Sequence, residues 1–201
     1  GFQHRWIRRD LDIVLLDSLL PLGNGFLLPR GPLREPPESL ERAGIIVLTR
    51  SGGRSDALGG TLAGLVAGRP VLRTRIRPTR LVAADGTEMP PSHLAGRRVF
   101  AFAGIARPDS FRQTLEGLGA EVAGFRAFPD HHRYDAGVVQ QIEKALRETG
   151  AEILVTTEKD GVKLFGVAAF SRRLFCLAVE TELLDGADAL ETALTVCIGR
   201  R

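Results

Sequence analysis

The chain has 201 residues, of which 44% are apolar and 25% are charged, and its formal net charge is +3. These values are typical of a globular protein long enough to bury a core, as one domain or as a large and a small lobe. The small net charge argues against nucleic-acid binding, because such proteins carry a strong basic patch. No apolar run approaches the roughly 20 residues that are needed to span a bilayer.

Residues 1–68 alternate strand-like and helix-like segments, which predicts the latter part of an α/β core. The expected elements, in chain order, are a strand at Asp12–Asp17, a short helix within Pro32–Gly44, a strand at Ile45–Leu48 and a helix at Ser55–Ala67, whose apolar stripe includes Leu58. The continuous apolar run of the first strand predicts burial on both faces. The chain opens at Gly1 without an initiator Met, and we expect it to be the later part of a longer enzyme.

Residues 69–97 have a different pattern. Apolar and basic residues alternate in Pro70–Arg77, which is typical of a half-exposed strand, and Arg80–Ala84 continues the pattern. Asp85 and Gly86 form a favoured tight-turn pair. We expect a small antiparallel linker region here, between the first α/β segment and a C-terminal α/β lobe at residues 98–201.

The C-terminal lobe returns to regular α/β alternation. Its clearest helix is Asp135–Gly150, because Val138, Ile142 and Leu146 line one face and Gly150 is a typical C-terminal stop. The other expected elements, in chain order, are strand Arg98–Gly104, helix Pro108–Leu118, strands Val122–Arg126 and Glu152–Thr156, helix Asp160–Phe165, strand Leu174–Val179 and helix Ala187–Ile198. Strands separated by helices pair in parallel through crossover connections, so the fold class is α/β with a mainly parallel sheet.

The two cysteines, Cys176 and Cys197, lie in unrelated apolar segments. This setting is typical of buried thiols in a reducing compartment, and it favours neither a disulfide framework nor a metal pair. We therefore expect a cytoplasmic location.

Candidate site residues should follow the strands, because ligands of parallel α/β folds gather beyond the carboxyl ends of the strands. Gln3 and His4 could present hydrogen-bonding groups to a polar ligand, or the segment could be a frayed terminus. Arg34 and Glu35 lie where an irregular Gly- and Pro-rich loop enters a helix. An Arg there opposes the helix macrodipole, so either an anion binds nearby or the segment is a solvated helix N-terminus.

A second candidate loop, Phe128–Tyr134, contains Asp130, His131 and His132 just before the clearest helix. An Asp–His pair can orient a general base or ligate a metal, and the alternative is a polar capping loop. The remaining histidines and both cysteines lie in unrelated segments, which argues against zinc.

A third candidate loop, Thr156–Leu164, directly follows a predicted buried strand. Thr157 and Asp160 resemble a helix capping box, and Lys159 or Lys163 could bind a phosphate. No Lys in the chain follows a Gly, so the sequence contains no phosphate-binding P-loop motif.

Taken together and in this order, these segments resemble the bacterial tetraacyldisaccharide 4'-kinase family of the lipid A pathway. The matching segments are Gly1–His4, Asp10–Asp17, Gly23–Gly25 with Leu28–Pro36, Phe128–Tyr134 and Thr156–Leu164, within about residues 1–165. The resemblance implies part of a P-loop kinase fold, with ATP and Mg²⁺ as cofactors. It also implies a lipid A disaccharide precursor as acceptor, a membrane surface as partner and a location at the cytoplasmic face of the inner membrane.

The resemblance also implies roles for individual residues. His131 would partner the family's proposed catalytic Asp, which this sequence lacks, in a base dyad, with Asp130 supporting it. Glu35 and His4 would lie near the metal and the phosphates. The residues implied for substrate or phosphate binding are Arg34, Gln3 and Lys159. The family's P-loop, its proposed catalytic Asp and the two Asp residues that precede the Gly matched by Gly1 do not occur in this sequence, so we expect the chain to be inactive by itself.

Two other interpretations stay open at this point. One is a degenerate, non-catalytic α/β domain that binds an anionic glycolipid or a protein partner. The other is an unrelated α/β enzyme that uses His131 and His132 on a sugar phosphate.

Overall fold

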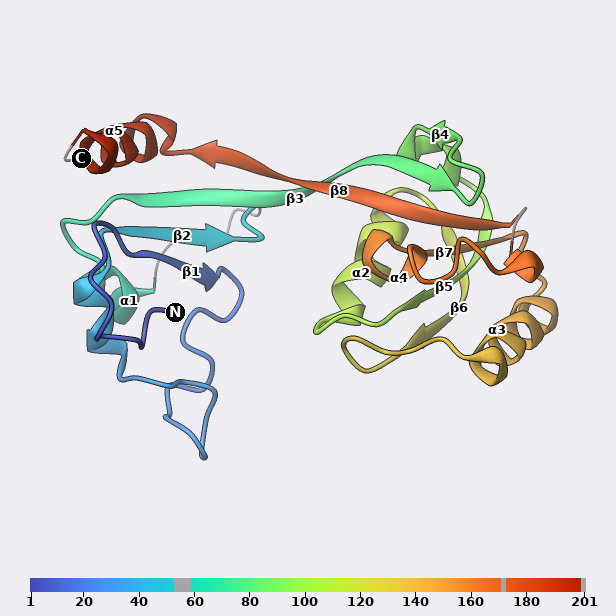
Figure 1. Ribbon diagram of the computed structural model, residues 1–201, viewed down its shortest axis with the longest axis horizontal. Helices are drawn as coiled ribbons and strands as arrows, with labels where there is room; N and C mark the ends of the chain where they lie inside the picture. Colours follow the sequence, from blue (N-terminus) through green and yellow to red (C-terminus); the bar gives the residue numbers. More distant parts are fainter. Residues whose placement is uncertain (53–58, 171–172, 200–201) are drawn as a thin grey trace. The chain divides into compact units, whose positions relative to one another are not determined.

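The computed structural model describes residues 1–52, 59–170 and 173–199 (Figure 1). They belong to two compact units, one made of Gly1–Arg77 and Thr181–Arg201, the other of Pro78–Glu180. The unit boundaries fall inside the two long strands β3 (Val71–Ala83) and β8 (Leu174–Asp185), each of which contributes residues to both units. Each unit is described by itself below.

The first unit contains a parallel sheet in the order β1-β2-β3. Besides its parts of β3 and β8, its elements are β1 (Ile13–Asp17), the 3₁₀ helix η1 (Pro37–Arg42), β2 (Ile45–Thr49), α1 (Gly60–Leu65) and α5 (Ala187–Ile198). Its core packs η1 and α1 against one face of β2, with Leu40, Ile46 and Leu62 buried together. Ion pairs from Arg73 to Asp185 and from Arg75 to Glu182 join β3 to β8 within this unit.

Burial of the first strand on both faces is not what the structure shows. Ile13 and Leu15 of β1 are 39% and 65% exposed, whereas Val14 and Leu16 on the opposite face pack against the core. The reason is one-sided packing, because the hydrophobic cluster of this unit lies against Val14 and Leu16, while Ile13 and Leu15 pack into none of the described clusters. An apolar run therefore identified the strand but not which of its faces is covered.

Two predicted helices of this unit are shorter in the structure. The helix expected within Pro32–Gly44 is the six-residue 3₁₀ helix η1, which starts at Pro37. Proline lacks the amide hydrogen that a helix interior needs, so it is tolerated only in a first turn. The helix expected at Ser55–Ala67 is α1, which begins at Gly60; Ser55 and Leu58 lie outside the described residues.

The second unit contains a run of four neighbouring strands in the order β8-β7-β5-β6, which pair in parallel, together with β4 and the end of β3. Besides its parts of β3 and β8, its elements are β4 (Glu88–Met89), the 3₁₀ helices η2 (Pro91–Leu94) and η3 (Ala168–Phe170), β5 (Arg98–Ala103), α2 (Pro108–Gly117), β6 (Glu121–Ala127), α3 (Ala136–Thr149), β7 (Ile153–Thr157) and α4 (Glu158–Gly161). The fold class is therefore confirmed as α/β with a mainly parallel sheet. The expected antiparallel pairing is also present, between β3 and β4.

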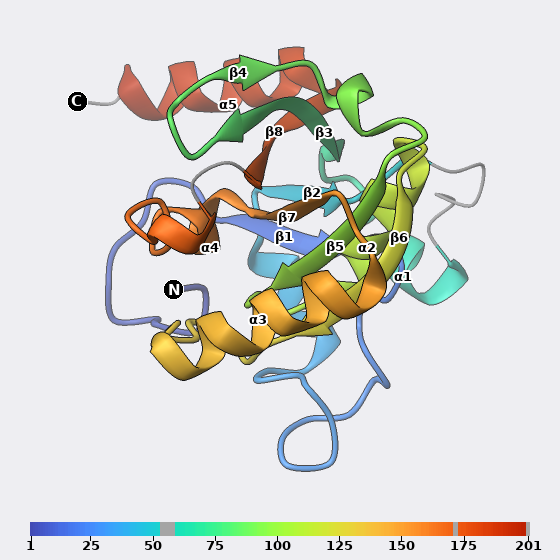
Figure 2. The same cartoon turned by 90° about the vertical axis from the view of Figure 1, so that its right-hand side faces the viewer.

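The helices α2 and α3 cover opposite faces of this sheet (Figure 2). Successive residues of a strand point to opposite faces, and β5 follows this rule. Its Ala101 packs in the cluster that contains Leu115 of α2, and its Phe102 packs in the cluster that contains Ile142 of α3. This arrangement buries β5 on both sides, from Val99 to Ala103.

Local signals placed the ends of α3 correctly. The carboxylate of Asp135 accepts a hydrogen bond from the Val138 amide at 2.9 Å, which caps the first turn. Gly150 ends the helix with φ +62°, in the left-handed region that glycine adopts most easily. The helix expected at Asp160–Phe165 is instead the single turn α4, which begins at Glu158 because Thr157 caps it by accepting the Asp160 amide.

The cysteines differ in burial, and both are free thiols. Cys176 is fully buried in β8, and this burial raises the pKa of its thiol to about 12. Cys197 in α5 is only partly buried, so the prediction of a buried thiol is confirmed for Cys176 alone. In the parts of the chain that the structure describes, no helix combines the length and the apolar character that crossing a membrane requires.

Candidate functional site

The predicted site residues fall into two groups, one in each unit. Gln3, His4, Arg34 and Glu35 belong to the first unit. Asp130, His131 and Lys159 belong to the second unit, where the loops after β6 and β7 meet at the carboxyl edge of the sheet. The two groups are described separately.

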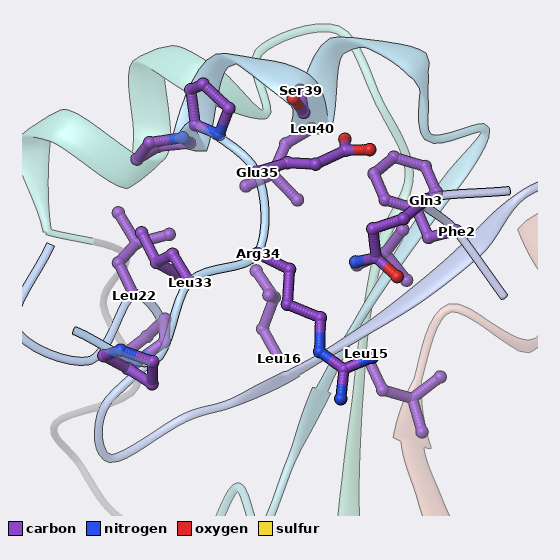
Figure 3. A pocket seen from close by; sticks show the side chains of 15 residues that line it. Phe2, Gln3, Leu15, Leu16, Leu22, Leu33, Arg34, Glu35, Ser39 and Leu40 are labelled. Atoms are coloured by element: carbon purple, nitrogen blue, oxygen red, sulfur yellow. The ribbon is translucent and has the colours of Figure 1, made fainter. Parts of the chain in front are cut away.

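Three of the first group line one pocket. Gln3, Arg34 and Glu35 surround it together with apolar side chains of β1 and η1 (Figure 3). His4 is exposed and is not among the lining residues. The structure thus brings Gln3, Arg34 and Glu35 together and leaves His4 outside.

Glu35 is held by Arg42, which sequence reasoning did not single out. The Arg42 guanidinium forms an ion pair with the Glu35 carboxylate and lies over the Phe2 ring, 4.5 Å from its centroid. Its hydrogen bond to the carboxylate is the main reason that the pKa of Glu35 lies below the ordinary value. Glu35 is therefore a fixed, ionised oxygen donor at the pocket wall.

Arg34 is in the opposite situation. Among the residues that the structure describes, its side chain forms no hydrogen bond or ion pair, and the residue is exposed. An unpaired guanidinium beside a pocket can bind a phosphate or carboxylate through two parallel hydrogen bonds. The pocket therefore combines the carboxylate of Glu35, which is paired with Arg42, with the guanidinium of Arg34, which is free to bind an anion.

The first unit offers a limited donor set for a metal. No group of three His, Cys, Asp or Glu side chains occurs among the described residues, so there is no all-protein metal cage in that part of the chain. Mg²⁺ is often held by only one or two carboxylates, with phosphates and water completing its octahedron. Glu35 fits that pattern, whereas the imidazole of His4 is not a donor that Mg²⁺ prefers.

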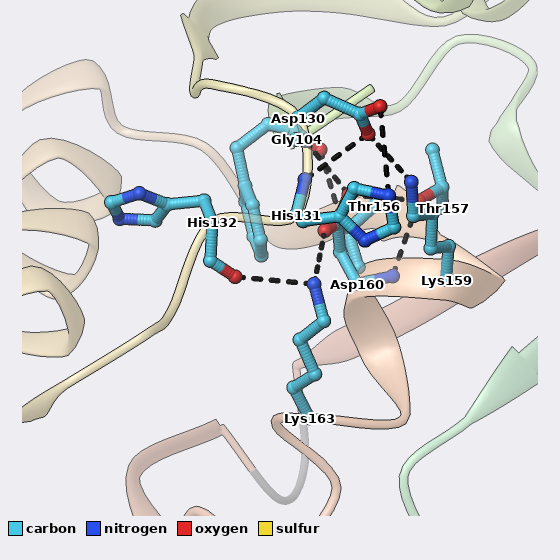
Figure 4. Close-up of polar contacts among 10 residues, drawn as sticks. Gly104, Asp130, His131, His132, Thr156, Thr157, Lys159, Asp160 and Lys163 are labelled. Carbon is cyan, nitrogen blue, oxygen red and sulfur yellow. Dashed lines mark hydrogen bonds and ion pairs between the residues drawn. The ribbon is translucent and has the colours of Figure 1, made fainter. Parts of the chain in front are cut away.

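The second unit places Asp130 at the centre of a small polar cluster (Figure 4). Its Oδ1 accepts hydrogen bonds from Lys159 Nζ at 2.5 Å and from the His131 backbone amide at 3.1 Å. Its Oδ2 lies 3.8 Å from Nε2 of His131. The hydrogen bond from Lys159 is the main reason that the pKa of Asp130 is lowered, and the charge of Lys159 and the neighbouring His131 lower it further.

The two adjacent histidines have different surroundings. The His131 side chain is 80% exposed, and its backbone has φ +61°, which is uncommon for a residue with a side chain. His132 instead stacks on Phe128, with ring centroids 4.6 Å apart and an interplanar angle of 18°. Tyr134 packs edge-on against the same pair of rings. His131 is thus available to a ligand, while His132 forms part of an aromatic cluster.

Asp160 has surroundings that the sequence did not reveal. It was expected only to cap a helix, yet its carboxylate is completely buried. It accepts hydrogen bonds from the Gly104 amide at 2.8 Å, from Thr157 Oγ1 at 2.9 Å and from Lys163 Nζ at 3.3 Å. The spacing of Asp160 and Lys163, three residues apart after a buried strand, was the available signal, because such a pair can meet across one turn.

The sequence matches a known family over almost its whole length. A family model described as tetraacyldisaccharide-1-P 4'-kinase (LpxK) matches residues 1–198. The tetraacyldisaccharide 4'-kinase of Syntrophus aciditrophicus is 50% identical over 177 residues, which cover 82% of this chain and 47% of that protein. The enzyme of the same name from Anaeromyxobacter dehalogenans strain 2CP-C is 48% identical over 201 residues, which cover 96% of this chain and 53% of that protein.

A solved structure is similar over the same extent. It is the "apo" form of LpxK from Aquifex aeolicus in complex with ATP, with 31% sequence identity and a TM-score of 0.68. The match covers 98% of this chain and 55% of that chain. The chain therefore spans about half the length of the relatives that it matches.

Proposed function

The chain belongs to the tetraacyldisaccharide-1-P 4'-kinase family, and from this premise we propose that it acts in transfer of the ATP γ-phosphate to a lipid A disaccharide precursor. Membership confirms the family expected from the sequence segments. The acceptor atom would be the 4'-hydroxyl, as the names of the relatives state. The single observation that carries a catalytic role for this chain is the exposed His131 imidazole beside an ionised Asp130.

His131 would act as the general base. Phosphoryl transfer to a sugar requires that the hydroxyl lose its proton as its oxygen attacks the γ-phosphorus and the bond to ADP breaks. A neutral imidazole can take that proton, and the carboxylate of Asp130 would then stabilise the resulting imidazolium. The low pKa of Asp130 supports this role, because the carboxylate keeps its charge at neutral pH.

Residues of the first unit would bind phosphate and metal. Arg34 has a guanidinium that is unpaired among the described residues and suits a phosphate, and Gln3 lines the same pocket with a hydrogen-bonding amide. Glu35 would hold Mg²⁺, which neutralises negative charge on the phosphates when it is bound. The relative that was crystallised in complex with ATP supports ATP as the phosphate donor.

Two further assignments concern Lys159 and a membrane surface. The ammonium of Lys159 is already bonded to Asp130, so a role in phosphate binding would use its remaining N–H donors.

A membrane surface is proposed as a partner because the acceptor is a lipid, with the cytoplasmic face of the inner membrane as the location. Trp6 is 99% exposed and lies between Arg5 and Arg8, and such a pairing of aromatic and basic side chains suits an anionic lipid surface.

A direct transfer assay tests the proposal. The full-length gene product is incubated with γ-labelled ATP, Mg²⁺ and tetraacyldisaccharide 1-phosphate in detergent micelles. We expect label at the 4' position, located by mass spectrometry of the product. A folded protein that binds the glycolipid without transferring label would favour the non-catalytic interpretation and overturn ours.

A further inference from the structure

We propose that Lys163, seated on the buried Asp160, is a positioning residue that fixes the backbone at His131. The inference rests on the proposed function, because the position of His131 matters to chemistry only if its imidazole is the base. It assigns Lys163 a role that acts through another residue, not through contact with a substrate.

The backbone of His131 needs external support. Its φ of +61° lies in the left-handed region, where a residue with a side chain is disfavoured unless its surroundings hold it there. On the N-terminal side, the carboxylate of Asp130 accepts the His131 amide at 3.1 Å. On the C-terminal side, Lys163 Nζ donates to the carbonyl of His132 at 3.1 Å. The strained residue is thus held at both of its neighbours (Figure 4).

Asp160 connects this support to the sheet. Its carboxylate is completely buried and is bonded to the Gly104 amide after β5 and to the Thr157 hydroxyl at the end of β7. Both partners lie at strand ends, so the carboxylate has a fixed position. A buried charge requires a compensating charge nearby, and Lys163 Nζ supplies it at 3.3 Å.

The ammonium of Lys163 has its position defined from three directions. Besides Asp160 and the His132 carbonyl, it lies 5.6 Å from the centroid of the Tyr134 ring, within the range of a cation–π contact. Its side chain is only one-third exposed, at 33%. Because the side chain of Lys163 is held in this way, it can keep the loop Phe128–Tyr134, here called the histidine loop, in a fixed position relative to the edge of the sheet.

Lys144, one of the three lysines of the chain, offers a matched control. Lys144 is 70% exposed, and among the described residues it pairs only with Glu148, one turn away on α3. In the full-length gene product we expect Lys163→Met to lower kcat for lipid phosphorylation about tenfold to a hundredfold, because small displacements of a catalytic group have effects of that order. The KM values for ATP and for the lipid should stay within about twofold, and Lys144→Met should change neither constant.

Two further measurements separate positioning from other roles. In a His131→Asn background, Lys163→Met should cause no further loss of kcat, because its effect passes through the imidazole. Independently of activity, the imidazole Cε1–H NMR signal of His131 should shift in Lys163→Met and not in Lys144→Met. If Lys163→Met does not fold, Lys163→Arg can be used instead, because it keeps a positive charge beside the buried Asp160. We then expect a partial loss of kcat with the same shift of the His131 signal.

The possible outcomes separate the role of Lys163 from the proposed kinase function. An increase in the KM for ATP with unchanged kcat would make Lys163 a phosphate ligand and overturn the inference. An unshifted His131 signal with unchanged kcat would also overturn it, while leaving the kinase proposal intact. If the wild-type protein transfers no phosphate, the proposed function fails, and the NMR signal then still decides whether Lys163 holds the histidine loop.

Discussion

Lys159 places its Nζ 2.5 Å from Oδ1 of Asp130 and so joins two loops that are 29 residues apart in the sequence. Asp130 follows β6, and Lys159 lies in the turn of α4 that follows β7. The contact keeps the carboxylate next to His131 ionised by a positive charge from a neighbouring loop. Because it is bonded to Lys159, the carboxylate of Asp130 keeps a defined orientation, which its proposed role in supporting His131 as a base requires.

Removing that charge should raise the pKa of Asp130. In Lys159→Met the main cause of the lowered value is lost, so we expect the titration midpoint of the Asp130 carboxyl carbon to move upward, toward the ordinary value of about 3.9. Carboxyl ¹³C NMR against pH measures it. Lys144→Met is the control and should leave the midpoint unchanged. An unchanged midpoint in Lys159→Met would mean that the ion pair does not persist in solution.

The same pKa sets the sign of a stability effect. A carboxylate with a lowered pKa in the folded state contributes stability above its unfolded pKa, and this contribution is lost as the pH falls through the folded pKa. We therefore expect the stability difference between wild type and Lys159→Met to be full near neutral pH and to vanish in strong acid. Urea denaturation at a series of pH values tests this. A difference that grew as the pH fell would contradict the assignment.

The imidazole and the backbone of His131 can be tested separately. We expect His131→Asn to lower kcat about a hundredfold or more in the transfer assay, which is the typical contribution of a general base. Asn tolerates a left-handed φ better than most residues, so the loop should keep its conformation. His131→Ala removes the imidazole and also strains the backbone, so it should be less stable than His131→Asn while losing similar activity. Full turnover in His131→Asn would remove the imidazole from the mechanism.

The sequence predicted the second unit better than the first because its signals are local. The cap at Asp135, the stop at Gly150 and the apolar run of β5 each act within one element, and the structure has all three. The exposure of Leu15 could not be predicted, because it depends on which face of β1 the residues of the hydrophobic cluster cover. The unit boundary inside β3 falls within residues 69–97, where the sequence pattern changes, whereas no change of pattern marks the boundary inside β8.

The site residues were likewise predicted where the signal is local and missed where it depends on long-range contacts. The motif that contains Asp130 and His131 could be recognised from residue types, and the two side chains are neighbours in the structure. The burial of Asp160 was not apparent from its own segment, because one of its hydrogen-bond donors is the amide of Gly104, 56 positions away and just after another strand. Adjacent histidines also looked equivalent in sequence, and only the stacking of His132 on Phe128 separates them.

Replacing Asp160 should destabilise the protein even though the change is small. In Asp160→Asn the charge that balances Lys163 is lost, and the hydrogen bonds from Gly104 and Thr157 lose their ionised acceptor. Hydrogen bonds to charged groups contribute more than neutral ones, so we expect a loss of about 2 to 3 kcal/mol in the free energy of unfolding. Asp10→Asn, at an exposed position, should change it by less than about 0.5 kcal/mol. Equal effects in urea denaturation would show that burial of Asp160 is unimportant.

Gly161 next to Asp160 should tolerate no side chain, because a Cβ there would lie 1.9 Å from Sγ of the buried Cys176. We expect Gly161→Ala to cost about 1 to 3 kcal/mol of unfolding free energy, as overpacked cores do. Gly166→Ala is the control, since its Cβ would meet nothing within 4 Å. Adding Cys176→Ala removes the clashing sulfur, so the double variant should be more stable than the sum of the two single changes predicts. Strict additivity in the denaturation midpoints would show that the two residues do not touch, and would leave the glycine of this segment without a packing explanation.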